Sequence, residues 1–241
     1  MIAFPVTVNG VRLAADPSGA LHWPERELLV VADLHFEKGS AFAARGSLLP
    51  PYDTAATLAR LTRIIERLEP RTVIALGDSF HDRCGGDRLS CGDRARLREL
   101  TASRDWIWVS GNHDPDPPKD LGGRSEAAVT LGALTFRHEP AEASARGEIC
   151  GHLHPKASIS VREKRISASC FVTDGTRMIL PALGAYTGGL DVAAAPVRRL
   201  FRRAFHVLML GRDRLYCFPS QRVVGGRPAE ARAIVRGVPA E

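Results

Sequence analysis

Five short clusters of polar residues carry the side chains best suited to chemistry. In chain order they are Asp33-Leu34-His35, Gly77-Asp78, Gly111-Asn112-His113-Asp114, His138 and Gly151-His152-Leu153-His154. Imidazole, carboxylate and carboxamide groups are nitrogen and oxygen ligands that suit borderline divalent ions such as Mn²⁺, Fe²⁺, Co²⁺ and Zn²⁺. None of the clusters contains a cysteine. The clusters therefore predict a site for divalent ions rather than for soft metals.

Each cluster taken alone has an ordinary structural explanation. Gly77-Asp78 is a common turn dipeptide, the Gly111 cluster could be a turn with side-chain hydrogen bonds, and a lone His138 is more often a surface or core residue than a ligand. Their position argues for chemistry, because the clusters follow apolar segments that read as strands. They also hold five of the eight histidines, and a sixth, His81, lies just beyond Gly77-Asp78.

The first half of the chain has the pattern strand, helix, strand, helix, strand. Apolar runs predict strands at residues 27–32, 72–76 and 106–109, and spacing of three and four predicts helices at 53–69 and 90–103. In an α/β sheet of this kind, the carboxyl ends of the strands form the ligand crevice. The i, i+2 spacing of Asp33 and His35 lets both side chains point the same way from an extended segment. We therefore expect the first three clusters to meet at one edge.

The rest of the chain is predicted to be rich in short strands. Asn9-Gly10 predicts an N-terminal β-hairpin within residues 1–26. Short strands are expected at 129–131, 134–137, 148–150, 171–173 and 177–180, followed by a basic helix at 196–205 and a hairpin of 205–210 with 215–218. We expect one domain over residues 1–224 and a flexible C-terminal tail over 225–241, which is rich in Gly, Pro, Ala and Arg.

Composition favours an anionic partner and a cytoplasmic location. The 241 residues carry a formal net charge of +6, and all but four of the 33 basic residues are arginines, whose forked guanidinium groups suit phosphate. The five cysteines form no CxxC pair, and their odd number favours reduced thiols over a complete set of disulfides. No apolar run is long enough to span a membrane. We therefore expect a cytoplasmic protein with no membrane contact.

The five clusters, in this order, resemble the signature of the calcineurin-like metallophosphoesterases over about residues 28–155. A narrower resemblance is to the bacterial DNA-ligase-associated metallophosphoesterases, which are nucleases linked to DNA repair. It rests on the segments Asp33-Leu34-His35-Phe36-Glu37-Lys38 and Gly77-Asp78-Ser79-Phe80-His81, and on Phe42, Arg45, Gly46 and Pro50. The chain departs from that group at Phe36-Glu37, where Leu-Gly is expected.

The resemblance implies an α/β fold, a four-layer α/β/β/α metallophosphoesterase sandwich with two mixed sheets and two divalent ions between them. Mn²⁺ is the favoured ion, with Fe²⁺, Co²⁺ or Zn²⁺ as alternatives. It implies that one ion is bound by Asp33, His35 and His154, that the other is bound by Asn112, His138 and His152, and that Asp78 bridges them. A hydroxide bridging two such ions can attack phosphorus in line.

Other residues are given roles by the same resemblance. His113, beside Asn112, is placed to protonate the leaving oxygen or to bind the phosphoryl group. His81 stands where many relatives have aspartate, and it either grips the phosphate, protonates a leaving group or only supports its neighbours. Asn112 would also contact substrate. Lys38 and Arg45 are expected to contact neighbouring phosphates, and Asp82 and Asp114 to orient the residues beside them.

Basicity and the narrower resemblance together imply a Mn²⁺-dependent DNA endonuclease that acts in repair on single-stranded, flapped or damaged DNA. The expected partners are DNA and the ligase and helicase of the same repair system, and a homodimer is left open. One alternative is a phosphodiesterase or phosphatase for nucleotides or phospholipid precursors. Another is a metal-binding adaptor without catalysis, against which His113 argues, because a structural metal site needs no proton donor beside it.

Overall fold

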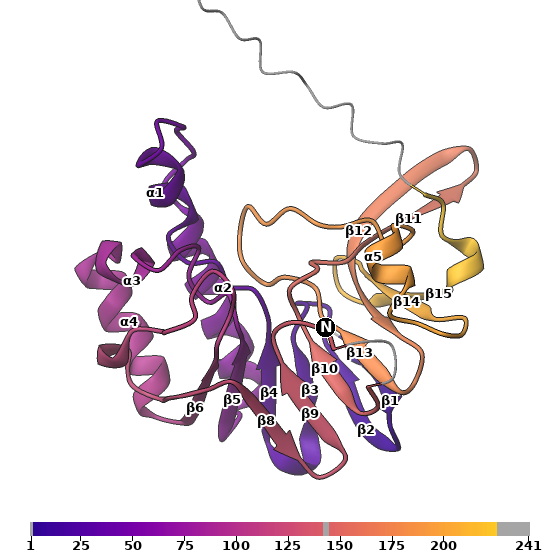
Figure 1. Cartoon of the computed structure of the whole chain (residues 1–241), viewed down its shortest axis with the longest axis horizontal. Coiled ribbons are helices and arrows are strands. Elements are labelled where there is room, and N and C mark those ends of the chain that lie inside the picture. The colour runs from indigo at the N-terminus through magenta and orange to yellow at the C-terminus, as the bar shows by residue number, and fades with distance from the viewer. Residues whose placement is uncertain (1, 142–144, 226–241) are drawn as a thin grey trace, which may run out of the picture.

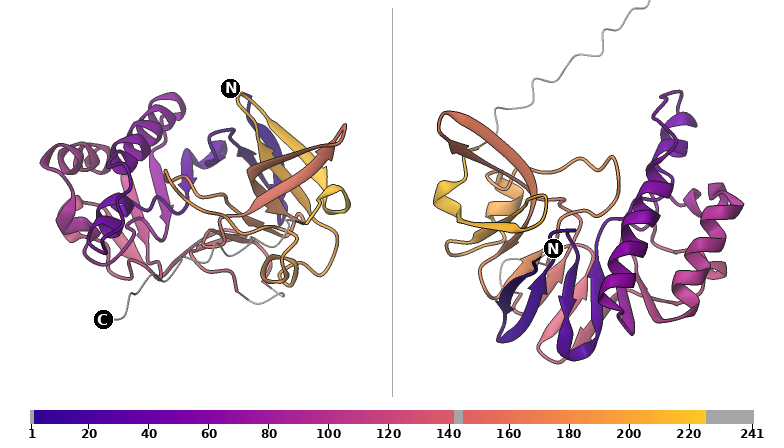
Figure 2. Two further views of the ribbon diagram at one scale, coloured as in Figure 1. Left: turned by 90° about the horizontal axis from the view of Figure 1, so that it is seen from above. Right: turned by 180° about the vertical axis from the view of Figure 1, so that it is seen from behind.

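Two β-sheets packed face to face form the centre of the molecule (Figures 1 and 2). The computed structural model describes residues 2–141 and 145–225. Of the predicted tail at 225–241, only Gly225 is among them. The prediction of one domain over residues 1–224 stays a prediction.

The first sheet contains seven strands in chain order, antiparallel from β1 to β4 and parallel from β4 to β7. The predicted N-terminal hairpin is confirmed, with Asn9 and Gly10 both at positive φ, as its tight turn requires. The strands are β1 (Phe4–Val8), β2 (Val11–Ala15), β3 (Leu21–Trp23), β4 (Leu28–Val31), β5 (Thr72–Leu76), β6 (Asp105–Val109) and β7 (Arg124–Glu126).

The second sheet is also mixed, in the order β15-β14-β12-β13-β10-β9-β8, with β11 paired to β12 outside this path. Within this second sheet, among the residues that the structure describes, only the pairs of β10 with β9 and with β13 are parallel. Its strands are β8 (Ala128–Leu131), β9 (Leu134–Arg137), β10 (Glu148–Cys150), β11 (Lys156–Val161), β12 (Lys164–Thr173), β13 (Arg177–Ile179), β14 (His206–Leu210) and β15 (Leu215–Pro219). The predicted short strands are confirmed, but β11 and the first half of β12 were missed. Apolar residues do alternate with serine there, but several of the alternating positions hold alanine, which makes the signal weak.

Two long helices, α2 (Asp53–Leu68) and α4 (Cys91–Ala102), cover the outer face of the first sheet (Figure 1). Both were predicted, and Ser90 caps α4 by accepting a hydrogen bond from the Asp93 backbone N–H at 3.0 Å. Two short helices, α1 (Lys38–Ala43) and α3 (Gly85–Arg88), lie in loops after the first two clusters. Neither α1 nor α3 was among the predicted helices.

Apolar packing arranges these elements in layers. Along β4, Leu28 and Val30 pack between the sheets, whereas Leu29 and Val31 pack against the helices. Both faces of the strand are thus buried, which explains its continuous apolar sequence. A third cluster lies outside the second sheet and includes Val197 of α5 (Ala195–Arg198). The predicted sandwich of two mixed sheets is confirmed.

The predicted basic helix at 196–205 was wrong in length. Only Ala195–Arg198 forms a helix. Phe201 and Phe205 instead pack their rings together, with centroids 4.9 Å apart, and the Leu200 carbonyl accepts a hydrogen bond from buried Arg177 at 3.0 Å. These tertiary contacts hold the segment as a turn, and the four arginines at 198, 199, 202 and 203 remain exposed.

Within the described part of the chain, no helix combines the length and apolar character that crossing a lipid bilayer would require.

Candidate metal centre

The five clusters converge where the strands of the two sheets end. Two groups of side chains each place one ligand atom per residue within 4.8 Å of the others, and these groups are Asp33, His35 and His154, and Asp78, His138 and His152. The first three clusters follow β4, β5 and β6, whereas His138 follows β9 and the last cluster follows β10. The centre is thus assembled from both sheets.

Asp78 lies between the two groups. Its Oδ2 atom is 3.3 Å from His138 Nε2 in one group and 3.9 Å from His35 Nε2 in the other. Its Oδ1 atom accepts a hydrogen bond from the His113 backbone N–H at 2.9 Å. The carboxylate is almost fully buried, so its orientation is fixed by these neighbours. This is the position that a bridging ligand needs.

Asn112 belongs to the second group, because its Oδ1 atom is 3.0 Å from both His138 Nε2 and His152 Nδ1. The Nδ1 atom of His138 lies 2.9 Å from the Leu76 carbonyl, to which it must donate. Its Nε2 atom is therefore the one that can bind a metal ion. Ligand histidines usually donate their other N–H in this way, which fixes the ring.

The first group is held against the loop that follows β10. The His35 and His154 Nε2 atoms are 3.2 Å apart, and Asp33 Oδ1 is 3.4 Å from His154 Nε2. The Asp33 carboxylate also accepts hydrogen bonds from the His152 backbone N–H, the shorter at 3.0 Å. A Cβ atom on Gly151 would lie 2.7 Å from Asp33 Oδ2, so glycine is required for this approach.

The backbone at the ligands differs from the predicted extended segment. Asp33 and His35 have φ values of 53° and 44°, and Asp78, His152 and His154 are also left-handed. Such values are uncommon for residues other than glycine, and they persist where surrounding contacts over-determine them. The i, i+2 spacing does bring both side chains to one site, but the backbone at these residues is left-handed rather than extended.

The charges at the centre favour a bound cation. Burial disfavours the charged form of His138, but its hydrogen bond with Asp78 and the charges of Asp33 and Asp78 outweigh burial and raise its pKa to about 9. Burial and the neighbouring His154 lower the pKa of His35, which keeps its imidazole neutral. The raised pKa of His138 shows that the buried carboxylates favour a positive charge at this place, which a divalent ion would supply instead of the proton. Carboxylates and imidazoles, with no sulfur, match the ligands of borderline divalent ions. The residues therefore fit the pair of ions that the fold implies.

His113 and His81 stack beside the first group, with ring centroids 5.3 Å apart. His113 Nδ1 lies 2.8 Å from the His81 carbonyl and must donate to it, while its Nε2 lies 4.0 Å from Asp78 Oδ2. Burial, followed by the charge of Lys38, lowers the pKa of His81 to about 4. His81 is therefore neutral at pH 7, and the His113 side chain, 41% exposed, is the more accessible of the two.

The other predicted residues lie farther from the ligand atoms. Lys38 begins α1, and its charge, like that of exposed Arg45, acts on His81. Asp82 forms an ion pair with Arg88 at 2.8 Å and accepts a hydrogen bond from the Cys84 backbone N–H. Asp82 thus fixes its own loop and has no hydrogen bond or ion pair with a predicted ligand in the described chain.

Asp114 is buried directly behind Asp78. Its Oδ2 atom accepts a hydrogen bond from the Phe80 backbone N–H at 2.9 Å, which links the second and third clusters. Burial and the charge of Asp78 raise the pKa of Asp114 to about 7. The neutral acid is therefore favoured in the folded protein below that pH.

We expect Asp114→Asn to change how stability depends on pH. The raised pKa of Asp114 gives wild-type protein a contribution that is complete below about pH 4 and is lost as the pH rises through about 7. Asparagine cannot ionise, so in metal-free protein the variant should gain about 2 kcal/mol relative to wild type between pH 5 and pH 8. Urea unfolding in EDTA at both pH values measures the free energies of unfolding. A difference between variant and wild type that does not change with pH would show that the pKa of Asp114 is not raised.

Two features of the site were not found from the sequence. Glu37, where the chain departs from the narrower group, is buried and accepts hydrogen bonds from Thr54 Oγ1 at 2.9 Å and Ser40 Oγ at 2.6 Å, which ties α1 to α2. The segment Leu183–Gly184 donates backbone hydrogen bonds to the Ala32 and Asp33 carbonyls at 2.9 and 3.1 Å. In the sequence, the sign of this contact would have been Gly184, which lies in a segment rich in small residues.

The chain was compared with known proteins. The family model of the calcineurin-like phosphoesterases matches residues 27–161. Among solved structures, the nuclease MPE of Pseudomonas putida has a TM-score of 0.69 at 28% identity, over 89% of this chain and 100% of that chain. Yfce, a phosphoesterase from E. coli, has a TM-score of 0.39 at 14% identity, over 79% of this chain and 97% of that chain. No curated protein sequence matches.

The family match covers more than half of the chain and contains all five clusters. It agrees with the two mixed sheets and with the paired ligand groups at their edge. The resemblance inferred from the clusters is thus confirmed, and the chain belongs to the calcineurin-like phosphoesterase family of metal-dependent phosphoesterases.

Proposed function

We propose that this protein is a two-metal phosphodiesterase, a Mn²⁺-dependent endonuclease for single-stranded or damaged DNA. The observation that carries the proposal is the position of Asp78 between two groups of ligand atoms, with His113 beside it. Similarity to the Pseudomonas putida nuclease, at 28% identity over the whole of that chain, favours a nuclease.

The residues divide into two ligand sets that share one carboxylate. Asp33, His35 and His154 would hold one divalent ion, Asn112, His138 and His152 the other, and Asp78 both. When bound, such ions lower the pKa of water and neutralise charge on the phosphate oxygens. Nitrogen and oxygen donors suit several borderline divalent ions, and among these we choose Mn²⁺ because the resemblance favours it.

His113 is the residue that we assign to the leaving group. Because its Nδ1 donates to the His81 carbonyl, only Nε2 can exchange a proton with substrate, and this atom faces the centre. His81, whose pKa is about 4, is neutral at pH 7 and can donate a hydrogen bond to a phosphate oxygen but is a poor source of a proton. We therefore assign proton donation to His113 and phosphate binding to His81.

This assignment predicts that the cost of His113→Ala depends on the leaving group. A DNA alkoxide needs a proton as it leaves, and general acid catalysis is worth about 10²–10⁴-fold. A nitrophenolate leaves without one, so the loss in kcat there should be under about tenfold, by the same reasoning. Steady-state rates on an oligonucleotide and on bis(4-nitrophenyl) phosphate measure the difference, and equal losses on both would contradict the assignment.

Substrate has open access beside the second group. A cavity of about 240 Å³ is lined there by Asn112, His138, Ser110 and Arg137, among others. Lys38 and Arg45 lie on the opposite side, near His81. The positive charge of Lys38 and Arg45 supports a polyanionic strand as substrate, whereas the cavity beside the second group is lined by Glu139 as well as by Arg137.

One comparison tests the proposed function. Purified protein with Mn²⁺ is given labelled single-stranded DNA, a chromogenic phosphodiester and a phosphomonoester. We expect cleavage of the DNA and of the diester. Turnover of the monoester or of nucleotides without DNA cleavage would favour the small-molecule alternative, and inactivity of the metal-loaded protein would favour the adaptor. The role in repair and the ligase and helicase partners stay predictions from the resemblance, and the cytoplasmic location stays a prediction from composition.

A further inference from the structure

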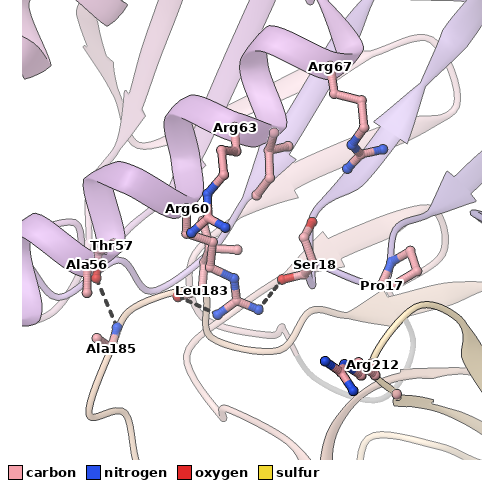
Figure 3. Close-up of a pocket in the computed structure, with 12 residues that line it drawn as sticks. Pro17, Ser18, Ala56, Thr57, Arg60, Arg63, Arg67, Leu183, Ala185 and Arg212 are labelled. Atoms are coloured by element: carbon pink, nitrogen blue, oxygen red, sulfur yellow. Dashed lines mark hydrogen bonds between the residues drawn. The ribbon is translucent and has the colours of Figure 1, made fainter. Parts of the chain in front are cut away.

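A second cavity, of about 480 Å³, lies between α2 and the loops at residues 17–18, 183–185 and 211–212, and is lined by four arginines (Figure 3). Arg60, Arg63 and Arg67 come from α2, and Arg212 comes from the turn between β14 and β15. We call this the arginine pocket. No carboxylate is among the described residues that line it, so it concentrates positive charge.

Arg60 is fixed at the centre of the arginine pocket. Its guanidinium donates to the Leu183 carbonyl at 3.0 Å and to the Ser18 carbonyl (Figure 3). Both partners are neutral, so they hold the group without cancelling its charge. Burial and the charge of Arg63 lower the pKa of Arg60, and the charge of nearby Asp16 offsets this only in part. An anion beside Arg60 would offset the rest.

The other three arginines differ in whether they already form an ion pair with a carboxylate. Arg67 forms an ion pair with buried Asp16 at 3.0 Å. Arg63 and Arg212 are exposed, and among the described residues neither forms an ion pair. Two guanidinium groups are therefore available to a ligand, and their forked N–H groups match phosphate oxygens.

The arginine pocket is next to the metal centre, separated from it by one segment of chain. The segment Leu183–Ala185 bonds through the Leu183 and Gly184 N–H groups to the carbonyls of Ala32 and Asp33. Its other side faces the pocket, where Arg60 binds the Leu183 carbonyl and Thr57 Oγ1 accepts from the Ala185 N–H at 2.9 Å (Figure 3). A DNA strand bound at the metal centre would therefore pass close to this pocket.

A second arginine-lined cavity shows that arginines alone do not make such a site. It has a volume of about 500 Å³ and contains Arg26, Arg71 and Arg104, but also Glu27 and Asp105. It lies where β4, β5 and β6 begin, at the edge opposite the metal centre. Arg71 pairs with Glu27 there. Two carboxylates among its lining residues offset part of its positive charge, whereas no carboxylate is among the described residues that line the arginine pocket.

We propose that the arginine pocket binds a backbone phosphate of the DNA strand, apart from the phosphodiester held at the metal centre. This inference rests on the proposed endonuclease function and adds a second binding point to it. The described lining contains no aromatic side chain on which a base could stack, which favours a backbone phosphate over a nucleobase.

The test compares Arg63→Gln/Arg212→Gln with Arg26→Gln/Arg71→Gln, which removes equal charge at the opposite edge. With Mn²⁺-loaded enzyme and a single-stranded oligonucleotide at 0.1 M salt, we expect the pocket variant to raise KM about tenfold with kcat unchanged, which corresponds to about 1.4 kcal/mol of binding free energy. The slope of log KM against log salt should fall by about 0.7 for each phosphate that the variant no longer neutralises. The control variant should change neither quantity.

Two substrates separate this inference from the proposed function. Bis(4-nitrophenyl) phosphate and a dinucleotide are too short to reach both sites, so the pocket variant should cleave them as wild type does. An equal rise in KM on these short substrates, or a rise on the oligonucleotide no larger than in the control variant, would overturn the inference and leave the endonuclease intact. Failure of wild-type protein to cleave the oligonucleotide while it cleaves the small diester would overturn the proposed function and the inference together.

Discussion

Asp78→Asn is expected to abolish hydrolysis of bis(4-nitrophenyl) phosphate, lowering kcat by about 10³-fold or more. The side chain keeps its size, but one of the two carboxylate oxygens becomes an NH₂ group, which donates hydrogen bonds and does not bind a metal ion. Loss of residues that only orient metal ligands already costs about 10–100-fold, and Asp78 approaches both groups directly. The bound metal should fall from two ions per chain to one or none, as measured by elemental analysis after dialysis against Mn²⁺.

Asp105→Asn is the matched control for this variant. Asp105 lies at the amino end of β6, where it pairs with Arg124 on the surface, at the opposite edge from Asp78. An exposed pair of this kind is worth about 0.2–1 kcal/mol, so activity and metal content should stay near those of wild type. If Asp78→Asn kept both ions and a tenth of the activity, Asp78 would not be the shared ligand.

Arg177→Met is expected to give the largest loss of stability, about 3–5 kcal/mol. Arg177 on β13 and Glu148 on β10 are both almost fully buried, and they form an ion pair at 2.8 Å between neighbouring strands. Removing the guanidinium leaves the Glu148 carboxylate buried without its closest cation. In a chain of this length, the loss corresponds to a fall in Tm of about 10 °C, measurable by circular dichroism.

Two further variants show whether the unpaired Glu148 carboxylate causes the loss of stability. Arg137 also approaches Glu148, at 3.7 Å, but is half exposed, so Arg137→Gln should cost under about 1 kcal/mol. In Glu148→Leu/Arg177→Met no charge is left buried, and most of the lost stability should return. A double variant as unstable as Arg177→Met alone would show that packing, not the stranded carboxylate, sets the cost.

Glu148 and Arg177 also support the metal centre from a distance. β10 leads directly into the cluster that contains His152 and His154, and Arg177 further donates to the Ala141 carbonyl at 3.1 Å, in the segment that follows His138. Three predicted ligands therefore belong to segments that this buried pair holds. The sequence did not predict this pair, because no local pattern at residue 148 or residue 177 indicates that β10 and β13 are neighbours.

Much of this protein could be predicted from local sequence. Continuous apolar runs located β4, β5 and β6, because strands buried on both faces leave no polar positions. Asn9-Gly10 located the first hairpin, because few other residue pairs tolerate two positive φ values. The order of five polar clusters after strands indicated the family, because the topology of such a sheet brings those ends together.

Where contacts distant in sequence compete with local preference, prediction failed. The basic segment 196–205 has a helical pattern, but burial of Phe201 and Phe205 and the hydrogen bond from Arg177 to Leu200 hold it in a turn. β11 and the first half of β12 alternate apolar residues with serine, but alanine at several apolar positions makes the local signal weak, and only their pairing with each other shows them as strands. The left-handed backbone at Asp33 and His35 depends on the loop around Gly151 and on Gly184, more than a hundred residues away.

The sequence by itself determined which residue types can bind metal and the order in which strands deliver them, since both follow from side-chain chemistry and local periodicity. Only the tertiary structure decided that Asp78 faces both ligand groups, that His113 keeps Nε2 toward the centre, and that arginines from α2 and from the turn at residue 212 line one pocket. These are relations between segments far apart in the chain. They are set by how the two sheets and α2 pack, which no local pattern encodes.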